Sequence, residues 1–351
     1  MCRKAKICMS ISFKINQSGG KPVYKQLIQQ FETKIKSGRL QTGDMVPSMN
    51  ELAKELDISR ETVKKVYSIL RDRGFLEPHQ GKGFYVKCPD ESRRLSVLIL
   101  FDKMSVYKQT ILNSFMAEMG SNIESTILLH NQNLDLYEYY LDLYLDDFDY
   151  YIVTPHFAFD EESQKRMHKL TSRIPNRKLI VLDRLPEGLK GNFGAVYQDF
   201  ENDAYDGLKQ GLQKIMKSGK LNMIKLPTSL YGDKVSLAVK RFCAEYGIEL
   251  YSYQKPPEDI MKDDIFLVVN SQLDTGISDL ADNISNNNLK IGKDVFIISY
   301  NEFPLNKVVL GGLTTISTDF EKMGRLAARM ILDKKMEKIK CNFGMIRRAT
   351  F

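Results

Sequence analysis

Hydrophobic residues recur at helical spacing in three segments between residues 22 and 73 of the chain. Within residues 22–36 they follow one another at steps of three and four, which predicts an amphipathic helix. Ser48 stands three residues before Glu51, a capping-box spacing that predicts the start of a second, shorter helix. A third helix is predicted for residues 60–73, because Ser59 can cap its first turn and apolar residues again form one stripe.

Two short helices joined by a tight turn, the second of them capped and basic, indicate a helix-turn-helix. Arg60 and Lys64 lie one turn apart at the start of the third helix, and arginine can pair with guanine through two hydrogen bonds. For this helix taken alone, a solvated basic face is the alternative interpretation. Two strand-like runs follow, with glycines between them, which is typical of a hairpin. In such a wing Gly81 permits close approach to the DNA backbone, and Lys82 can neutralise a phosphate.

From Leu95 onward the pattern changes to short, continuous apolar runs, as expected for parallel strands that are buried on both faces. Helical stretches lie between several of them, and residues 200–217, 233–245 and 320–332 are the clearest. This alternation predicts a doubly wound α/β architecture, and its length suits two lobes better than one. The apolar runs lie at residues 95–101, near 125, and from 149, 178, 221, 265 and 295.

The location of charge strengthens the nucleic-acid interpretation of the first quarter. The whole chain has a net charge of +7, but residues 1–94 alone carry 19 Lys and Arg against 10 Asp and Glu. The remaining residues are slightly acidic. A basic N-terminal segment joined to a near-neutral remainder is the pattern expected of a DNA-binding module on a separate domain.

Several other classes of protein are disfavoured by what the sequence lacks. No apolar run reaches the length of a membrane span, and we expect neither a membrane partner nor a signal peptide. The five cysteines are scattered without a CxxC pair, so we expect reduced thiols in the cytoplasm and no metal site. No dinucleotide-binding glycine motif, phosphate-binding loop or G-x-S-x-G elbow occurs, so we expect no cofactor, no catalytic residues and no enzyme activity.

The run IKSGRLQTGDMVPSMNELAKELDISRETVKKVYSILRDRGFLEPHQGKGFYV resembles the DNA-binding domain of GntR-family regulators. The G-x-L-x-x-G-x-x-x-P-S turn, the S-R-x-T-V helix start and the G-x-G wing occur in the order of that family. One position departs from it, since many members carry arginine where this chain has Asn50. Together with the charge pattern, the resemblance implies that these residues contact double-stranded operator DNA: Ser48, Asn50, Arg60, Thr62, Lys64, Lys65, Gln80, Gly81 and Lys82.

The remainder of the chain resembles the effector domain of LacI-family repressors, which has a periplasmic-binding-protein-like fold. The most specific matches are IGKDVFIISYNEFP and LTTISTDFEKMGRLAARMIL, and IPNRKLIVLDR also resembles a family segment. Three polar positions that grip ligand in that family are altered here, near Val235, Ser271 and Asn301. The resemblance implies a cleft between two lobes for a small polar effector.

The resemblance places seven effector-binding residues in that cleft: Asp102, Tyr107, Asp183, Arg184, Lys234, Asn270 and Asn301. Acids and amides can accept or share hydroxyl hydrogens, and Tyr107 could stack on a sugar ring, which favours a neutral sugar over a phosphorylated one. For Arg184 the alternative is a structural pair with Asp183 or with a neighbouring loop. For the strand-end residues the alternative is a polar end that faces solvent.

These observations together predict an α/β protein with an N-terminal winged helix-turn-helix and a two-lobed, doubly wound, periplasmic-binding-protein-like domain. We expect the DNA-binding domain at 1–88, a linker at 89–94, and an effector-binding and dimerisation domain at 95–351. The expected function is that of a homodimeric transcription regulator, a repressor controlled by a sugar-like effector. The alternatives are an activator, a constitutive DNA binder whose second domain only dimerises, and an enzyme with a DNA-binding appendage.

Overall fold

The chain divides into two compact units, the head (residues 1–94) and the body (residues 95–351). The structure is a computed structural model that describes residues 12–16, 22–36, 38–87, 94–225, 231–269 and 276–351. Most of the predicted linker and most of the segment before residue 19 lie outside the described residues, as does Asn270.

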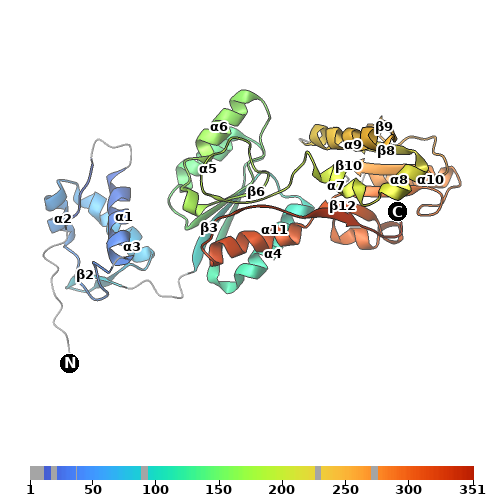
Figure 1. Cartoon of the computed structure of the whole chain (residues 1–351). Helices are drawn as coiled ribbons and strands as arrows, with labels where there is room; N and C mark the ends of the chain where they lie inside the picture. The colour runs from blue at the N-terminus through green and yellow to red at the C-terminus, as the bar shows by residue number, and fades with distance from the viewer. Residues whose placement is uncertain (1–11, 17–21, 37, 88–93, 226–230, 270–275) are drawn as a thin grey trace. The chain divides into compact units, whose positions relative to one another are not determined.

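The described part of the head contains three helices followed by a two-stranded hairpin, in the order that the sequence predicts (Figure 1). The predicted capping box is formed, because Ser48 Oγ accepts from the Glu51 amide at 3.2 Å and the Glu51 carboxylate accepts from the Ser48 amide at 2.8 Å. Asp57 then adopts a left-handed conformation and turns the chain into the next helix. The elements are α1 (Val23–Lys36), α2 (Met49–Leu56), α3 (Arg60–Asp72), β1 (Leu76–His79) and β2 (Gly83–Val86).

The core of the head fixes which side of α3 faces solvent. Val63, Val66, Tyr67 and Leu70 of α3 are all fully buried, and the Tyr67 ring packs edge-on against Phe31 of α1. The Tyr67 hydroxyl donates to the backbone oxygen of the segment before α2, so the buried phenol is not left unpaired. Because one stripe of α3 is held in this way, its opposite side chains must point outward.

The first lobe of the body is a six-stranded parallel sheet of order β13-β7-β6-β5-β3-β4. Helices α4 and α11 pack together on one face of this sheet, and α5 and α6 cover the other (Figure 1). The strands are β3 (Leu95–Phe101), β4 (Ile123–Leu129), β5 (Tyr150–Val153), β6 (Leu179–Asp183), β7 (Gly194–Tyr197) and β13 (Lys338–Lys340). The helices are α4 (Val106–Met119), η1 (Gly120–Asn122), α5 (Leu134–Tyr144), α6 (Glu161–Thr171), η2 (Asn176–Lys178) and α11 (Phe320–Leu332).

The second lobe has a matching six-stranded sheet of order β14-β12-β11-β10-β8-β9, in which β14 alone runs antiparallel to its neighbour. The strands are β8 (Lys220–Lys225), β9 (Glu249–Tyr253), β10 (Ile265–Val269), β11 (Phe296–Tyr300), β12 (Thr314–Thr318) and β14 (Phe343–Ile346). The helices are α7 (Asp203–Lys209), α8 (Leu212–Ser218), α9 (Gly232–Tyr246), α10 (Gly276–Asn286), η3 (Pro304–Lys307) and η4 (Val309–Gly311). The predicted fold class is therefore confirmed.

The described chain crosses between the lobes in three places, after β7, after β12, and between β13 and β14. We call these the three crossovers. Two backbone hydrogen bonds tie them together, from the Asp319 amide to the Asn342 oxygen at 3.2 Å and from the Cys341 amide to the Tyr197 oxygen at 2.8 Å. Any change in the angle between the lobes must therefore be absorbed by this small bonded region.

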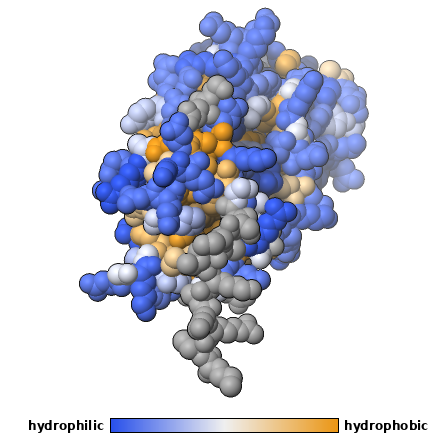
Figure 2. Space-filling view, turned by 90° about the vertical axis from the view of Figure 1, so that its left-hand side faces the viewer, coloured by the Kyte–Doolittle hydropathy of each residue, from blue (hydrophilic) through white to orange (hydrophobic). Residues whose placement is uncertain are grey.

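The single helix predicted over residues 200–217 is instead two helices, α7 and α8. The break falls at Gln210 and Gly211, where a side-chain Cβ on Gly211 would lie 2.9 Å from Met345 and from Phe351. Periodicity alone could not reveal this close packing against the C-terminal segment. Figure 2 looks onto the head, whose surface on that side is mainly hydrophilic with hydrophobic side chains gathered near its middle.

Two further expectations concern membrane-spanning helices and metal sites. No described helix is both long and apolar enough to span a membrane. Within the same residues, no group of three or more His, Cys, Asp or Glu side chains is arranged to hold a metal ion. Cys243 and Cys341 are free and buried, and burial raises the pKa of their thiols to about 11 and about 12.

Candidate DNA-binding surface and effector site

The first turn of α3 presents the side chains that were predicted to read DNA. Arg60 is exposed, and Lys64 is exposed and lies 3.5 Å from the Glu61 carboxylate. Ser59 caps the helix by accepting from the Thr62 amide at 3.1 Å, and its hydroxyl lies 2.8 Å from the Thr62 hydroxyl. Thr62 therefore stabilises the first turn of α3, and it also lies beside the exposed side chains of Arg60 and Lys64.

Two more of the predicted DNA contacts have partners within the head itself. Ser48 forms the capping box at the start of α2, and the Lys65 ammonium lies 3.9 Å from the centre of the Tyr24 ring. Both side chains are nevertheless exposed, as is Asn50 in the first turn of α2. Their predicted contacts with DNA stay predictions.

The hairpin has the geometry expected of a wing. Strands β1 and β2 pair antiparallel, with His79 opposite Gly83, and the tip between them holds Gln80, Gly81 and Lys82, all exposed. Gly81 has a φ of +73° and open space on the side where a Cβ would stand. Glycine is favoured in this conformation, and the open space allows another backbone to approach closely.

In the body, the predicted acids Asp102 and Asp183 lie at the carboxyl ends of β3 and β6, and a buried lysine joins them. The Lys108 ammonium of α4 contacts the Asp102 carboxylate and lies 3.8 Å from Asp183 Oδ2. All three side chains are essentially inaccessible, with exposures of 1%, 0% and 0% for Asp102, Lys108 and Asp183. Burial lowers the pKa of Lys108 to about 8, while the carboxylate of Asp183 opposes that shift.

Asp183 is the centre of a wider cluster. Its Oδ2 accepts from the Tyr107 hydroxyl at 3.0 Å and lies 3.1 Å from His156 Nε2. Burial would raise the pKa of Asp183, but His156, Lys108 and Gln198 together hold it below its ordinary value. Burial also lowers the pKa of His156 to about 4. The φ of Asp183 is +73°, in the left-handed region that few residues other than glycine adopt, and such strain is concentrated at functional sites.

Arg184 is directed to a neighbouring loop and helix. Its guanidinium donates to the Gln164 side chain at 3.0 Å and to the Pro155 oxygen at 3.5 Å, and it lies 4.5 Å from the centre of the Phe159 ring. This geometry agrees with the alternative in which Arg184 pairs with a neighbouring loop. Arg184 directly follows Asp183 in the chain, so it lies at the same edge of the first sheet as the Asp183 cluster.

The second lobe contributes Lys234 and Asn301. Lys234 of α9 pairs with Glu201 at 2.6 Å and lies 5.3 Å from the centre of the Phe159 ring of the first lobe. Asn301 follows β11 with a φ of +76°, and its side-chain oxygen is buried with no hydrogen-bond partner among the described residues. Asp183 and Asn301 thus occupy corresponding strained positions at strand ends in the two lobes.

An aromatic cluster that sequence reasoning missed joins the lobes near these residues. The Tyr231 ring, at the start of α9, stacks on Phe200 with centres 4.0 Å apart and meets His156 edge-on at 5.1 Å. Phe159 lies edge-on to Tyr231 as well, at 5.5 Å. The aromatic-rich PHFAF segment after β5 was the available signal, but no spacing rule connects it with a tyrosine more than 70 residues later.

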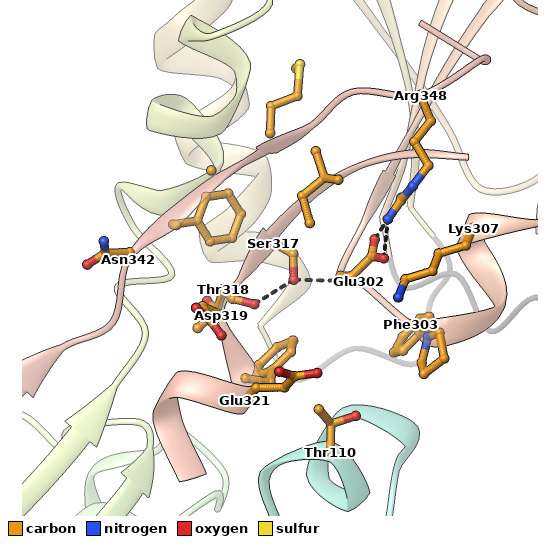
Figure 3. Close-up of a pocket in the computed structure, with 16 residues that line it drawn as sticks. Thr110, Glu302, Phe303, Lys307, Ser317, Thr318, Asp319, Glu321, Asn342 and Arg348 are labelled. Atoms are coloured by element: carbon orange, nitrogen blue, oxygen red, sulfur yellow. Dashed lines mark hydrogen bonds and ion pairs between the residues drawn. The ribbon is translucent and has the colours of Figure 1, made fainter. Parts of the chain in front are cut away.

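A separate cavity of about 470 Å³ lies beside the crossovers (Figure 3). Thr110 of α4 faces it from the first lobe, and Lys307 and Phe303 face it from the second. Arg348 on its wall is paired with Glu302 at 2.5 Å. None of the six predicted effector residues that the structure describes lines this cavity.

A winged helix-turn-helix head and a two-lobed periplasmic-binding-protein-like body define a DNA-binding transcription regulator with an effector domain. Residues 23–86 match the model for bacterial regulatory proteins of the gntR family, and residues 193–340 match that for the periplasmic binding protein-like domain. The chain is 30% identical over 97 residues to the HTH-type transcriptional repressor YtrA of Bacillus subtilis, covering 28% of this chain and 71% of that protein. The chain belongs to the GntR family, whose members are transcription regulators and not enzymes.

Another curated relative matches over a similarly short part of the chain, and solved structures share the fold over most of it. The HTH-type transcriptional repressor NagR of Bacillus subtilis is 37% identical over 87 residues, which are 25% of this chain and 36% of NagR. The trehalose repressor of Escherichia coli is similar in structure with a TM-score of 0.55 and 14% identity, over 72% of this chain and 99% of that chain. A LacI-type regulator of Alkaliphilus metalliredigens complexed with D-xylulofuranose has a TM-score of 0.52 and 14% identity, over 73% and 98%. These likenesses show that this chain shares the fold of LacI-type regulators.

Proposed function

We propose that the protein is a homodimeric repressor whose affinity for operator DNA is controlled by a sugar-like effector bound between the lobes of the body. The observation that supports the effector site most directly is the convergence of Asp102, Tyr107 and Asp183 around Lys108 at one edge of the first sheet. Ligands of open α/β sheets bind at the carboxyl ends of the strands. The proposed domains are 1–88 and 95–351, joined by a linker at 89–94.

A sugar-like ligand suits the chemistry of this edge. Carboxylates and amides accept hydroxyl hydrogens. The rings of Phe159 and Tyr231 lie close by, and aromatic side chains are common in the sites of such ligands. The related regulator with D-xylulofuranose bound has the same body fold, which is why we include ketopentoses in the proposed class. Arg184 and Lys234 are already engaged with Gln164 and Glu201, so they leave little capacity for a phosphate.

A ligand screen tests this proposal by the melting temperature of the purified full chain. A ligand present at 100 times its Kd adds about 2.7 kcal/mol to stability, so a sugar that binds should raise the melting temperature clearly. For each sugar that does so, we expect Tyr107→Phe, which removes a hydroxyl from the proposed site, to reduce the shift strongly. Tyr139→Phe, at an exposed tyrosine of α5, should retain it. A panel of pentoses, hexoses and deoxy-sugars without any shift, or with equal shifts in both variants, would contradict the proposed site.

For the homodimer we propose an apolar surface beside the cavity. Leu305 and Val308 are 53% and 69% exposed, and they flank the cavity residue Lys307. Val106 on α4 and Ile346 on β14 are also exposed, and Ile346 lines the cavity. Scattered exposed apolar residues are ordinary, but Ile346 lines the cavity and Leu305 and Val308 each adjoin a lining residue in the chain. Apolar residues gathered at a hollow are characteristic of an association surface. Two-fold symmetry would then supply the second head that a palindromic operator needs.

The double variant Leu305→Asp, Val308→Asp is expected to convert the protein from dimer to monomer, because four like charges would meet at a two-fold interface. Sedimentation velocity at micromolar concentration measures the change. Leu237→Asp, Met261→Asp is the matched control, since both residues are exposed apolar side chains elsewhere on the second lobe. A dimer that survives the first pair of substitutions would place the interface on another face.

A constitutive DNA binder is the second candidate function, and one observation favours it. Asp102 and Asp183 already have internal partners in Lys108, Tyr107 and His156, so neither acid needs a ligand to be satisfied. The ligand screen separates the two functions. An operator affinity that no sugar changes would favour the constitutive binder.

A further inference from the structure

The two oxygens of the Asp183 carboxylate face different parts of the body. Oδ2 meets Tyr107, His156 and Lys108, which all belong to the first lobe and surround the proposed effector site. Oδ1 accepts a hydrogen bond from the side-chain amide of Gln198, the first residue after β7. One carboxylate therefore connects the effector site with the first crossover.

The hydrogen bonds continue from the first crossover to the second. Gln198 Oε1 accepts from the Thr318 hydroxyl at 2.9 Å, and Thr318 is the last residue of β12. The next residue, Asp319, caps α11 by accepting from the Lys322 amide and donates its own amide to Asn342 in the third crossover. The hydrogen-bonded chain Asp183–Gln198–Thr318 thus reaches two of the crossovers. It ends one residue before Asp319, whose amide is bonded to the third crossover at Asn342.

Burial makes this chain sensitive to a change at either end. Asp183, Gln198 and Thr318 are 0%, 5% and 2% exposed, so water cannot easily replace a lost partner. An ionised carboxylate only accepts hydrogen bonds, which requires the Gln198 amide nitrogen to face it. The Gln198 oxygen then faces Thr318, whose hydroxyl must donate. The charge and position of Asp183 therefore determine the orientation of both side chains.

We propose that Gln198 and Thr318 are positioning residues that transmit a change at Asp183 Oδ2 to the crossovers and so couple the effector site to operator affinity. A ligand hydroxyl that replaces Tyr107 or His156 at Oδ2 moves the carboxylate, and Oδ1 then alters its bond to Gln198. Coupling of this kind needs an element with two arrangements that both sites bias. The three bonded crossovers are that element. The inference rests on the proposed function, because the effect that it predicts is a change in operator affinity.

A double-variant cycle tests the coupling without requiring the effector. Asp183→Asn is the perturbation, and the probe is a duplex selected by the wild-type protein from a random pool. In the wild-type background we expect Asp183→Asn to change the Kd for this duplex by about tenfold, within the range typical of coupled sites. In the Thr318→Val background the same substitution should change it by less than about threefold, because the chain is already interrupted.

Thr315→Val is the matched control, because Thr315 is also a buried residue of β12 but donates to Glu302 instead of Gln198. The tenfold effect of Asp183→Asn should persist in that background. Tyr107→Phe, which removes one bond to Oδ2, serves as a milder perturbation if Asp183→Asn does not fold. Equal effects in the Thr318→Val and wild-type backgrounds, or no effect of either perturbation on a folded protein, would overturn the proposal. A failed sugar screen with intact coupling would refute the ligand class alone.

Discussion

Lys108→Ala is expected to destabilise the body by about 3–5 kcal/mol, which is the usual cost of removing one partner from a buried charge pair. Lys108 has no exposed surface and is the cation that lies between Asp102 and Asp183. Without it, the side-chain partners of the Asp102 carboxylate among the described residues are the Thr154 hydroxyl at 3.1 Å and Gln132 at 3.4 Å. Scanning calorimetry of the full chain, which separates transitions of unlike domains, measures the change.

Two further variants identify the cause of the loss. Lys103→Ala removes an exposed lysine five residues earlier and should leave the melting temperature nearly unchanged. Lys108→Met with Asp102→Asn removes the cation and one acid together, and it should recover much of the stability, since replacing a whole buried pair costs far less than breaking it. If Lys108→Ala melts like the wild type, the two acids must share a proton or be reached by water, and the cluster would not depend on its lysine.

The fold of the head could be predicted from the sequence because its signals are local. The capping box of Ser48 and Glu51 and the N-cap at Ser59 involve residues within one helical turn, and the structure confirms both. The wing follows equally from two short apolar runs and a glycine turn. Interactions of this kind are set by the chain's own neighbours, so tertiary packing does not override them.

In the body, local sequence patterns predict less of the structure. Apolar runs identified seven strands of the body but missed β7 and β12, which lie inside the two sheets. β9 has a mixed pattern of exposed and half-buried residues and carries no such run. The partners of Asp183 in the proposed effector site are still harder to predict from the sequence. Lys108 is a lysine in an otherwise ordinary helix, and Gln198 is one amide after a strand; only the topology places both against Asp183. Strand-end position pointed to Asp183, whereas its partners depend on contacts between distant segments, which a single sequence does not display.

Arg60→Ala is expected to weaken binding to a selected operator duplex by about 10- to 100-fold, with most of the loss confined to sequences that carry one particular base pair. Arg60 is the first residue of α3, it is exposed, and the buried stripe of α3 holds it on the outer side of the head. A two-pronged bond to guanine discriminates among bases, whereas a phosphate contact does not. Fluorescence anisotropy at one fixed salt concentration, with the selected duplex and single-base variants of it, measures both affinity and selectivity.

Arg71→Ala is the control that separates base recognition from charge. Arg71 lies in the last turn of the same helix, where its guanidinium pairs with Asp72 at 2.8 Å. Removing it takes away the same formal charge far from the end of the helix that is expected to contact base edges. We expect a loss of a few-fold at most, equal for all sequences and smaller at higher salt. If Arg60→Ala behaves in the same way, the exposed cations of α3 are a solvated, non-specific face, and operator selectivity must come from the wing and from α2.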